Sequence, residues 1–135
     1  MDIIKWRDSY ETGIAEMDNQ HRQLIQLINQ LYGIIKEKDG FESVDAILQE
    51  MANYAEHHLR DEEKLLEEHG FPGLADQQKS HRNYFMKMDE LQEAMEKDGR
   101  DAAQEIYVFL RQWWINHIVL EDKEYGPYLR GKGLK

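Results

Sequence analysis

Cysteine is absent from the 135-residue sequence, which excludes disulfide bonds, thiolate metal ligands and cysteine nucleophiles. Basic residues are scarce: 17 lysines and arginines stand against 27 acidic residues, for a formal net charge of -10. This balance argues against binding to nucleic acid or to anionic membranes. No apolar run is long enough to span a bilayer, and residues 1–6 lack the pattern of a signal peptide. We therefore expect a cytoplasmic protein.

The apolar residues that are present recur with the period of an α-helix. In the first such stretch they alternate in steps of three and four, at His21, Leu24, Ile28, Leu31 and Ile35, which is typical of a helix with one buried stripe. Three later stretches show the same pattern, and the total length suits one domain, residues 1–135. We predict an all-α fold, an up-down-up-down four-helix bundle over residues 18–130 that follows an N-terminal arm, residues 1–17.

Local signals predict where these helices begin and end. Asp18 is a plausible N-cap of the first helix. Gly70 followed by Pro72 is a strong stop signal for the second helix, and Gly126 with Pro127 marks the expected end of the fourth. The predicted helices cover roughly residues 18–38, 42–69, 74–98 and 101–125.

Polar side chains interrupt the apolar stripes at one level of the predicted bundle. His58 and Glu62 are four residues apart, so both lie on the apolar face of their helix. A charge on that face is costly unless it is paired or bound to a metal ion. In an up-down bundle, the polar positions on all four stripes fall roughly 5–16 Å from the same end. The residues that converge there are His21, His58, Glu62, Gln77, His81 and His117.

This convergence predicts a metal site. A single buried histidine is more often a hydrogen-bonded core residue than a metal ligand. Four histidines and a carboxylate at matching depth, with at least one histidine from every helix, favour a shared metal instead. Imidazole and carboxylate without thiolate suit iron, zinc, copper or manganese, and the spacing does not choose among them. More ligands than one tetrahedral ion needs, together with a carboxylate that can bridge, favour a pair of ions.

The motifs resemble those of a known family over nearly the whole chain. They are Asp18-x-Gln20-His21, His58-Leu59-x-x-Glu62-Glu63, His81, and Trp113-x-x-x-His117-Ile118-x-x-x-Asp122-x-x-Tyr125. In this order and spacing, the chain resembles the bacterial hemerythrins.

The resemblance implies a non-haem centre of two iron ions with an oxo or hydroxo bridge that binds dioxygen reversibly. Carried over to this sequence, the iron with the open position is held by His21 and His58, the second iron by His81 and His117, and the bridging carboxylates are Glu62 and Asp122. The walls of the oxygen pocket would be Leu24, Leu59, Trp113, Trp114 and Ile118.

Gln77 departs from the family pattern, which has a histidine four residues before His81. An amide oxygen is a weaker and harder ligand than imidazole. Gln77 could bind iron through oxygen, hold a water that binds, or leave a vacancy. With two histidines per iron the centre becomes nearly symmetric and resembles oxidising di-iron enzymes. We therefore expect an oxygen adduct that decays faster, with peroxidase-like turnover as the alternative outcome.

Trp114 is a second departure, because family members commonly place leucine three residues before the histidine at position 117. A dry apolar wall matters beside bound oxygen, since water and protons promote its loss as a reduced product. Trp114 could narrow the pocket or donate its indole N–H into it. It could equally be an ordinary core residue.

The role that the resemblance gives to Asp122 conflicts with the geometry of a regular α-helix. In a regular helix Glu121, four residues after His117, shares its face, whereas the fifth residue is rotated away by about 140°. The resemblance nevertheless assigns the bridge to Asp122. We therefore predict a local wide turn or bend there; a regular helix would favour Glu121.

Three functions are compatible with these residues. The first is a dioxygen-binding di-iron protein for storage, delivery or sensing, expected to be a monomer. The second is a di-iron oxidase or peroxidase, made possible by Gln77. The third is an interaction domain in which the metal ions are structural.

Overall fold

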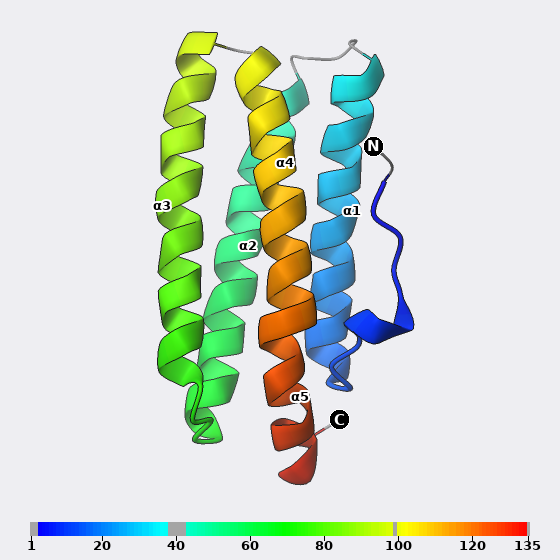
Figure 1. The fold of residues 1–135 in the computed structure, drawn as a ribbon, viewed down its shortest axis with the longest axis vertical. Coiled ribbons are helices and arrows are strands. Elements are labelled where there is room, and N and C mark those ends of the chain that lie inside the picture. Colours follow the sequence, from blue (N-terminus) through cyan, green and yellow to red (C-terminus); the bar gives the residue numbers. More distant parts are fainter. Residues whose placement is uncertain (1–2, 38–42, 99, 135) are drawn as a thin grey trace.

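The computed structural model describes residues 3–37, 43–98 and 100–134, and these residues form helices without any strand. A short 3-10 turn, η1 (Asp8–Tyr10), is followed by α1 (Ala15–Glu37), α2 (Ser43–Glu68), α3 (Leu74–Asp98), α4 (Arg100–Asn116), the turn η2 (His117–Glu121) and α5 (Asp122–Gly131). Figure 1 shows the long helices α1, α2, α3 and α4 side by side, with α5 continuing α4 and the N-terminal arm lying along α1. The predicted all-α four-helix bundle is confirmed.

The buried side chains form two apolar clusters. The larger one fills most of the bundle and includes Leu24, Leu59 and Ile118. The smaller one, which includes Met17 and Leu66, lies where α1 begins and α2 ends. Along α1 and α2 the buried polar positions lie between members of the two clusters. The apolar clusters therefore enclose a polar layer and keep it from water. No described helix has the length and apolarity needed to cross a membrane.

The turn between α2 and α3 ends α2 where the sequence predicts. Gly70 has φ 64°, a left-handed conformation that glycine adopts readily. Its N–H donates to the Glu67 carbonyl (3.2 Å), and the Phe71 N–H donates to the Leu66 carbonyl (3.0 Å). This pair of bonds is the Schellman arrangement, which satisfies the last carbonyls of a helix. The predicted ends of the neighbouring helices at residues 38–42 and 99 lie outside the described residues.

Asp18 is not the N-cap of the first helix, because α1 begins three residues earlier, at Ala15. Its carboxylate instead points back to the end of the arm. It accepts hydrogen bonds from the Thr12 N–H (2.8 Å), the Thr12 hydroxyl (2.9 Å) and the Gly13 N–H (3.2 Å). The side chain satisfies amides of the loop, as an N-cap would, but it does so from inside the first turns of the helix.

The predicted end of the fourth helix before Gly126 is also wrong, since α5 runs through Pro127 to Gly131. Gly126 serves a different purpose. A Cβ atom at this position would lie 2.4 Å from the Thr12 carbonyl oxygen, which is closer than nonbonded atoms can approach. The glycine therefore lets the arm pass directly against α5.

We expect Gly126→Ala to destabilise the protein by about 1–3 kcal/mol, because the added methyl group must push the arm backbone away. Urea unfolding followed by circular dichroism measures this change. Gly131→Ala is the matched control in the same helix, since its Cβ would meet nothing within 4 Å. Equal stability of the two variants would show that the arm does not constrain α5.

Candidate metal centre

The polar layer contains all seven residues that the sequence predicts as metal ligands. They come from α1, α2, α3, the turn η2 and the start of α5, and none is more than 3% exposed: His21, His58, Glu62, Gln77, His81, His117 and Asp122. Burial of so many polar groups in one layer requires that they satisfy one another or share a ligand.

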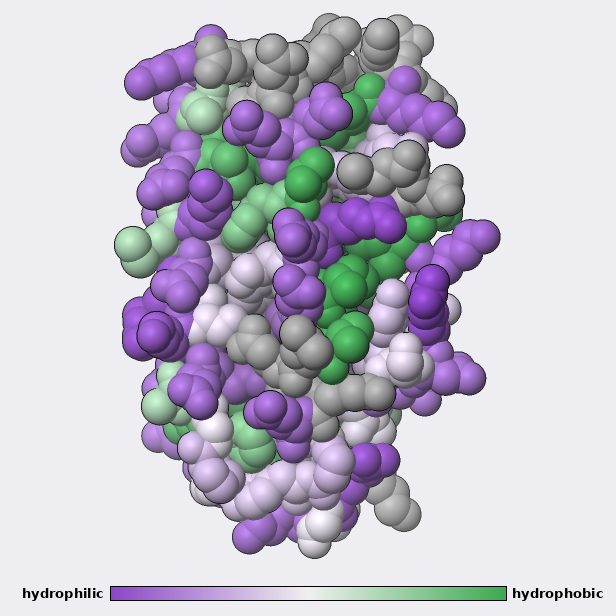
Figure 2. Space-filling view, viewed as in Figure 1, coloured by the Kyte–Doolittle hydropathy of each residue, from purple (hydrophilic) through white to green (hydrophobic). Residues whose placement is uncertain are grey.

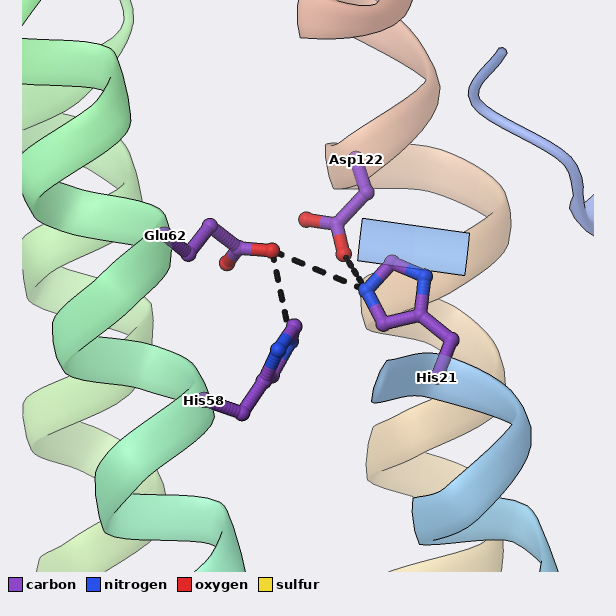
Figure 3. Close-up of side chains that lie close together, drawn as sticks. All are labelled: His21, His58, Glu62 and Asp122. Carbon is purple, nitrogen blue, oxygen red and sulfur yellow. Dashed lines mark ion pairs between the residues drawn. The ribbon is translucent and has the colours of Figure 1, made fainter. Parts of the chain in front are cut away.

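Glu62 lies at the centre of the layer, and its two carboxylate oxygens face different histidines. Oε1 is 3.0 Å from His81 Nε2 and 2.9 Å from His117 Nε2. Oε2 is 3.4 Å from His58 Nε2 and 3.6 Å from His21 Nε2, as Figure 3 shows for that half of the layer. The carboxylate thereby divides the four imidazoles into two pairs.

Asp122 spans the same two pairs from the opposite side. Its Oδ2 is 2.8 Å from His21 Nε2, and its Oδ1 is 3.1 Å from His117 Nε2. The Gln77 amide nitrogen also donates to Oδ1, at 3.3 Å. Gln77 therefore joins the half that contains His117. Two carboxylates that each reach both halves have the arrangement of bridging ligands.

The backbone at η2 explains how Asp122 reaches this layer. Residues 117–121 form a π-helical turn, and the Asp122 N–H donates to the His117 carbonyl, five residues earlier. The extra residue in the turn brings position 122 onto the face of His117, where a regular α-helix would place position 121. The predicted wide turn is confirmed. The Glu121 side chain lies outside the described residues.

Outer partners orient the imidazoles. His58 Nδ1 is 2.5 Å from the Gln20 amide oxygen, and the Gln20 amide nitrogen donates to Asp61 at 3.2 Å. His81 Nδ1 is 3.2 Å from a Glu63 carboxylate oxygen. A histidine that donates its Nδ1–H outward presents the Nε2 lone pair to the centre, as metal-binding histidines commonly do.

We expect Gln20→Ala to weaken metal binding by about 10–100-fold, because the His58 ring loses the acceptor that fixes its orientation. Competition for iron with a chromophoric chelator measures this loss. Gln23→Ala is the matched control, since Gln23 is an exposed residue of the same helix. An unchanged affinity in Gln20→Ala would show that packing alone positions His58.

Tyr125 is part of the site, although the sequence analysis gave it no role. Its hydroxyl donates to Glu62 Oε2 at 2.9 Å, and the ring is fully buried. Burial and the neighbouring Asp122 and Glu62 carboxylates raise its pKa well above 10, so the phenol keeps its proton and remains a donor. The signal was available, since Tyr125 lies three residues after Asp122 on the same helix face.

Without metal the layer is electrostatically unbalanced. Burial disfavours charge on His21, but Asp122 and Glu62 outweigh burial and raise its pKa to about 9. Burial lowers the pKa of His58 to about 4, so this imidazole is neutral at pH 7. Burial and then the Glu62 charge raise the pKa of Asp122 to about 6. The pKa of His21 is thus raised while that of His58 is lowered, although both histidines are buried. Such opposed pKa shifts are typical of a site that is arranged to hold positive charge.

The donor set fits two metal ions. The ligand atoms of His21, His58, Glu62 and Asp122 lie within 4.8 Å of one another, and those of Glu62, His81 and His117 form a second such group. His58 Nε2 is buried and faces the centre without a hydrogen-bond partner, as expected of a lone pair aimed at a metal. Imidazole and carboxylate suit iron and its neighbours in the first transition row.

Apolar side chains border the layer on the side predicted for the oxygen pocket. Trp114 is fully buried, with its ring 5.7 Å from His58 and 5.6 Å from His117 between centroids. Trp113 stacks on His117 at 4.6 Å with an interplanar angle of 17°. All five predicted wall residues belong to the larger cluster or pack against it: Leu24, Leu59, Trp113, Trp114 and Ile118. Their contact with bound gas stays a prediction.

Comparisons with known proteins point to one family. A model described as the hemerythrin HHE cation binding domain matches residues 12–129. Bacteriohemerythrin from Clostridium acetobutylicum is 30% identical over 127 residues, covering 91% of this chain and 98% of that protein. Bacteriohemerythrin from Stenotrophomonas maltophilia is 28% identical over 130 residues, covering 96% of this chain and 84% of that protein. Myohemerythrin from Riftia pachyptila is 26% identical over 121 residues, covering 89% and 88% of the two chains.

A solved structure supports the fold independently. The crystal structure of wild-type hemerythrin superimposes with a TM-score of 0.80 at 22% identity, covering 93% of this chain and 97% of that chain. At 22% identity, this structural similarity establishes the fold alone.

Proposed function

This chain belongs to the hemerythrin family of HHE cation-binding domains, and from that premise we propose that it is a non-haem di-iron protein that binds dioxygen reversibly. The observation that carries the proposal is the position of Glu62. Each of its carboxylate oxygens faces one pair of imidazoles, which is the arrangement that two ions sharing a carboxylate require. The names of the curated relatives, bacteriohemerythrin and myohemerythrin, agree with it.

Each half of the layer would hold one iron. His21 and His58 supply the imidazoles of one half, and His81 and His117 those of the other. Glu62 and Asp122 would be the carboxylates shared by the two ions, and an oxo or hydroxo group would complete the bridge. A bound pair of ferrous ions supplies the two electrons that dioxygen accepts reversibly.

The surrounding residues protect and orient the centre. Gln20 holds the ring of His58 through Nδ1, and a Glu63 carboxylate oxygen lies 3.2 Å from Nδ1 of His81. Tyr125 donates a hydrogen bond to Glu62 and keeps one oxygen of the bridge in place. The apolar wall that includes Trp114 excludes water, which limits proton delivery to the bound gas. These features suit oxygen storage, delivery or sensing.

Metal analysis combined with optical spectroscopy tests the proposal. We expect two iron ions per chain and a visible absorption band that appears when the reduced protein meets oxygen and disappears under vacuum. Such reversibility distinguishes oxygen binding from oxidation. A single tetrahedral zinc ion, or two irons whose spectrum does not respond to oxygen, would contradict it.

A second candidate function, a di-iron oxidase or peroxidase, is favoured by Gln77. Its amide nitrogen donates to Asp122, and the imidazoles divide evenly, two on each half. A centre with equal halves has room for a reactant on both sides. Peroxide-dependent oxidation of a reducing dye, with iron-free protein as the control, separates this function from reversible binding. The absence of turnover would overturn this second function.

We expect iron binding to release about one proton from His21 per chain near pH 7, in addition to the proton lost by a water that forms the bridge, because a metal-bound imidazole must be neutral. The pKa of about 9 leaves His21 protonated in the metal-free chain at this pH. The apparent affinity should therefore rise as the pH increases from 7 toward 9. Calorimetry in two buffers of different ionisation enthalpy measures the release, which should be smaller at pH 8.5. Identical heats in both buffers at pH 7 would contradict the assignment.

A further inference from the structure

A groove with a volume of about 580 Å³ separates the N-terminal arm from α4. None of the seven candidate metal ligands lines it. Figure 2 shows hydrophobic side chains gathered along the junction of the arm and α4, with hydrophilic side chains beside them. The residues used below are Ile3, Lys5 and Arg7 from the arm, and Val108, Arg111 and Ile115 from α4.

The groove exposes apolar surface that the rest of the protein buries. Four large apolar side chains are exposed in the described part of the chain, and two of them, Ile3 at 47% and Val108 at 39%, line this groove. They belong to opposite walls, one to the arm and one to α4. Exposed apolar side chains that face each other across a hollow can contact one apolar ligand at the same time.

The charge of the groove is opposite to that of the protein. Lys5, Arg7 and Arg111 line it, and among the residues that the structure describes no acidic one does, although the whole chain has a net charge of -10. Neither Lys5 nor Arg7 forms an ion pair with a described residue, whereas Arg111 donates to the Tyr107 hydroxyl at 3.0 Å. A local excess of positive charge in an acidic protein selects for an anion.

The arm wall is held in position before any ligand arrives. The Ile4 N–H donates to the Asn29 side-chain oxygen at 2.8 Å, and the Asn29 amide donates back to the Ile4 carbonyl at 2.9 Å. Trp6 packs edge-on against Tyr10 at 5.5 Å, and the Arg22 guanidinium lies 4.4 Å above the Trp6 ring. A wall fixed by α1 loses little freedom when it binds a ligand, so binding costs less.

We propose that this groove is a binding site for a small organic anion with an apolar body, such as a medium-chain carboxylate. Lys5 and Arg7 contact the anionic head, and Ile3 and Val108 contact the body. The volume lies in the usual range of small-molecule sites. The ligand would lie against Ile115, two residues before His117 and outside the metal centre.

Octanoate and 1-octanol are the probes, because they share an apolar chain and differ in the charged head. The iron-loaded protein is titrated with each, and binding is followed by displacement of the fluorescent anion 8-anilinonaphthalene-1-sulfonate. We expect octanoate to displace the dye from one saturable site and to bind at least about tenfold more tightly than octanol. Equal displacement by both would overturn the proposal, since the cations would then play no part.

Two variants test the two walls separately. Lys5→Gln combined with Arg7→Gln should weaken octanoate binding by about tenfold. Val108→Asp, at an exposed position, should weaken it at least as much, because it places a carboxylate beside the ligand. Lys64→Gln combined with Lys79→Gln is the control, since it changes the net charge equally on exposed positions outside the groove.

The control variant should bind octanoate as the unaltered protein does, within a factor of about two. Equal weakening in the control and the groove variants would show a general effect of net charge and overturn the site. Tighter displacement of the dye by an acidic amphipathic peptide than by octanoate would also overturn it, because the groove would then fit a protein segment. Iron content and absorption spectrum, measured in every variant, report whether the metal centre is intact.

Discussion

Glu62→Gln is expected to remove iron from both halves of the centre. Glutamine has the same shape, but it replaces one oxygen by an NH₂ group and removes the charge that both pairs of imidazoles face. Outer-shell changes cost about 10–100-fold in metal affinity, and loss of a shared ligand should exceed about 100-fold. Iron per chain, measured after desalting in the presence of a chelator, should fall to near zero. Because Glu62 touches both halves, the two ions should be lost together.

The same variant should also destabilise the metal-free protein, by roughly 1–3 kcal/mol, because the buried Tyr125 hydroxyl and the imidazoles of His81 and His117 lose the carboxylate that they face. Glu67→Gln is the matched control, an exposed glutamate on the same helix, and it should retain iron and stability. Retention of one iron per chain in Glu62→Gln would contradict the bridging role. The remaining ion would then show which half does not need the carboxylate.

Gln77→His is expected to give an oxygenated protein that survives longer and retains iron better. A third imidazole would complete the half that contains His81 and His117, and neutral imidazole is the better ligand for iron. Iron transfer to a chelator should slow by at least about tenfold, since a direct ligand contributes at least as much as an outer-shell partner. Decay of the oxygen-dependent absorption band measures the lifetime in the same samples.

Gln78→His provides the control, because it makes the same change one residue later, at a position that lines a surface hollow beside Phe85. It should leave both the lifetime and the iron transfer rate unchanged. If Gln77→His behaves like this control, residue 77 has no ligand role and acts only through its hydrogen bond to Asp122. If Gln77→His also abolishes peroxidase turnover, the presence of only two imidazoles on each half of the centre is the cause of that activity.

Helical periodicity was sufficient to predict the bundle and the level of its polar layer. The stripe through His21 and Leu24 fixes which face of the first helix is buried, and the same holds for His58 and Glu62 on the second. Gly70 and Pro72 mark the turn between α2 and α3 because their backbone preferences are local. The predicted roles of Asp18 as an N-cap and of Gly126 as a helix end were wrong because both residues make tertiary contacts. Their partners, Thr12 and the arm, lie elsewhere in the chain, and local preference carries no information about them.

The amino-acid order by itself determined the all-α class, the four helices and six of the seven side chains that meet between them, because periodicity and apolar burial are properties of each helix alone. The seventh, Asp122, reaches the site only through the π-helical turn, since a regular helix favours Glu121. The tertiary structure decided how these side chains are paired. Only three-dimensional packing assigns one oxygen of Glu62 to His58 and the other to His81, places the Gln20 amide against His58, and sets the arm beside α4 to form a basic groove. These relations depend on distances between separate helices, which no single stretch of sequence contains.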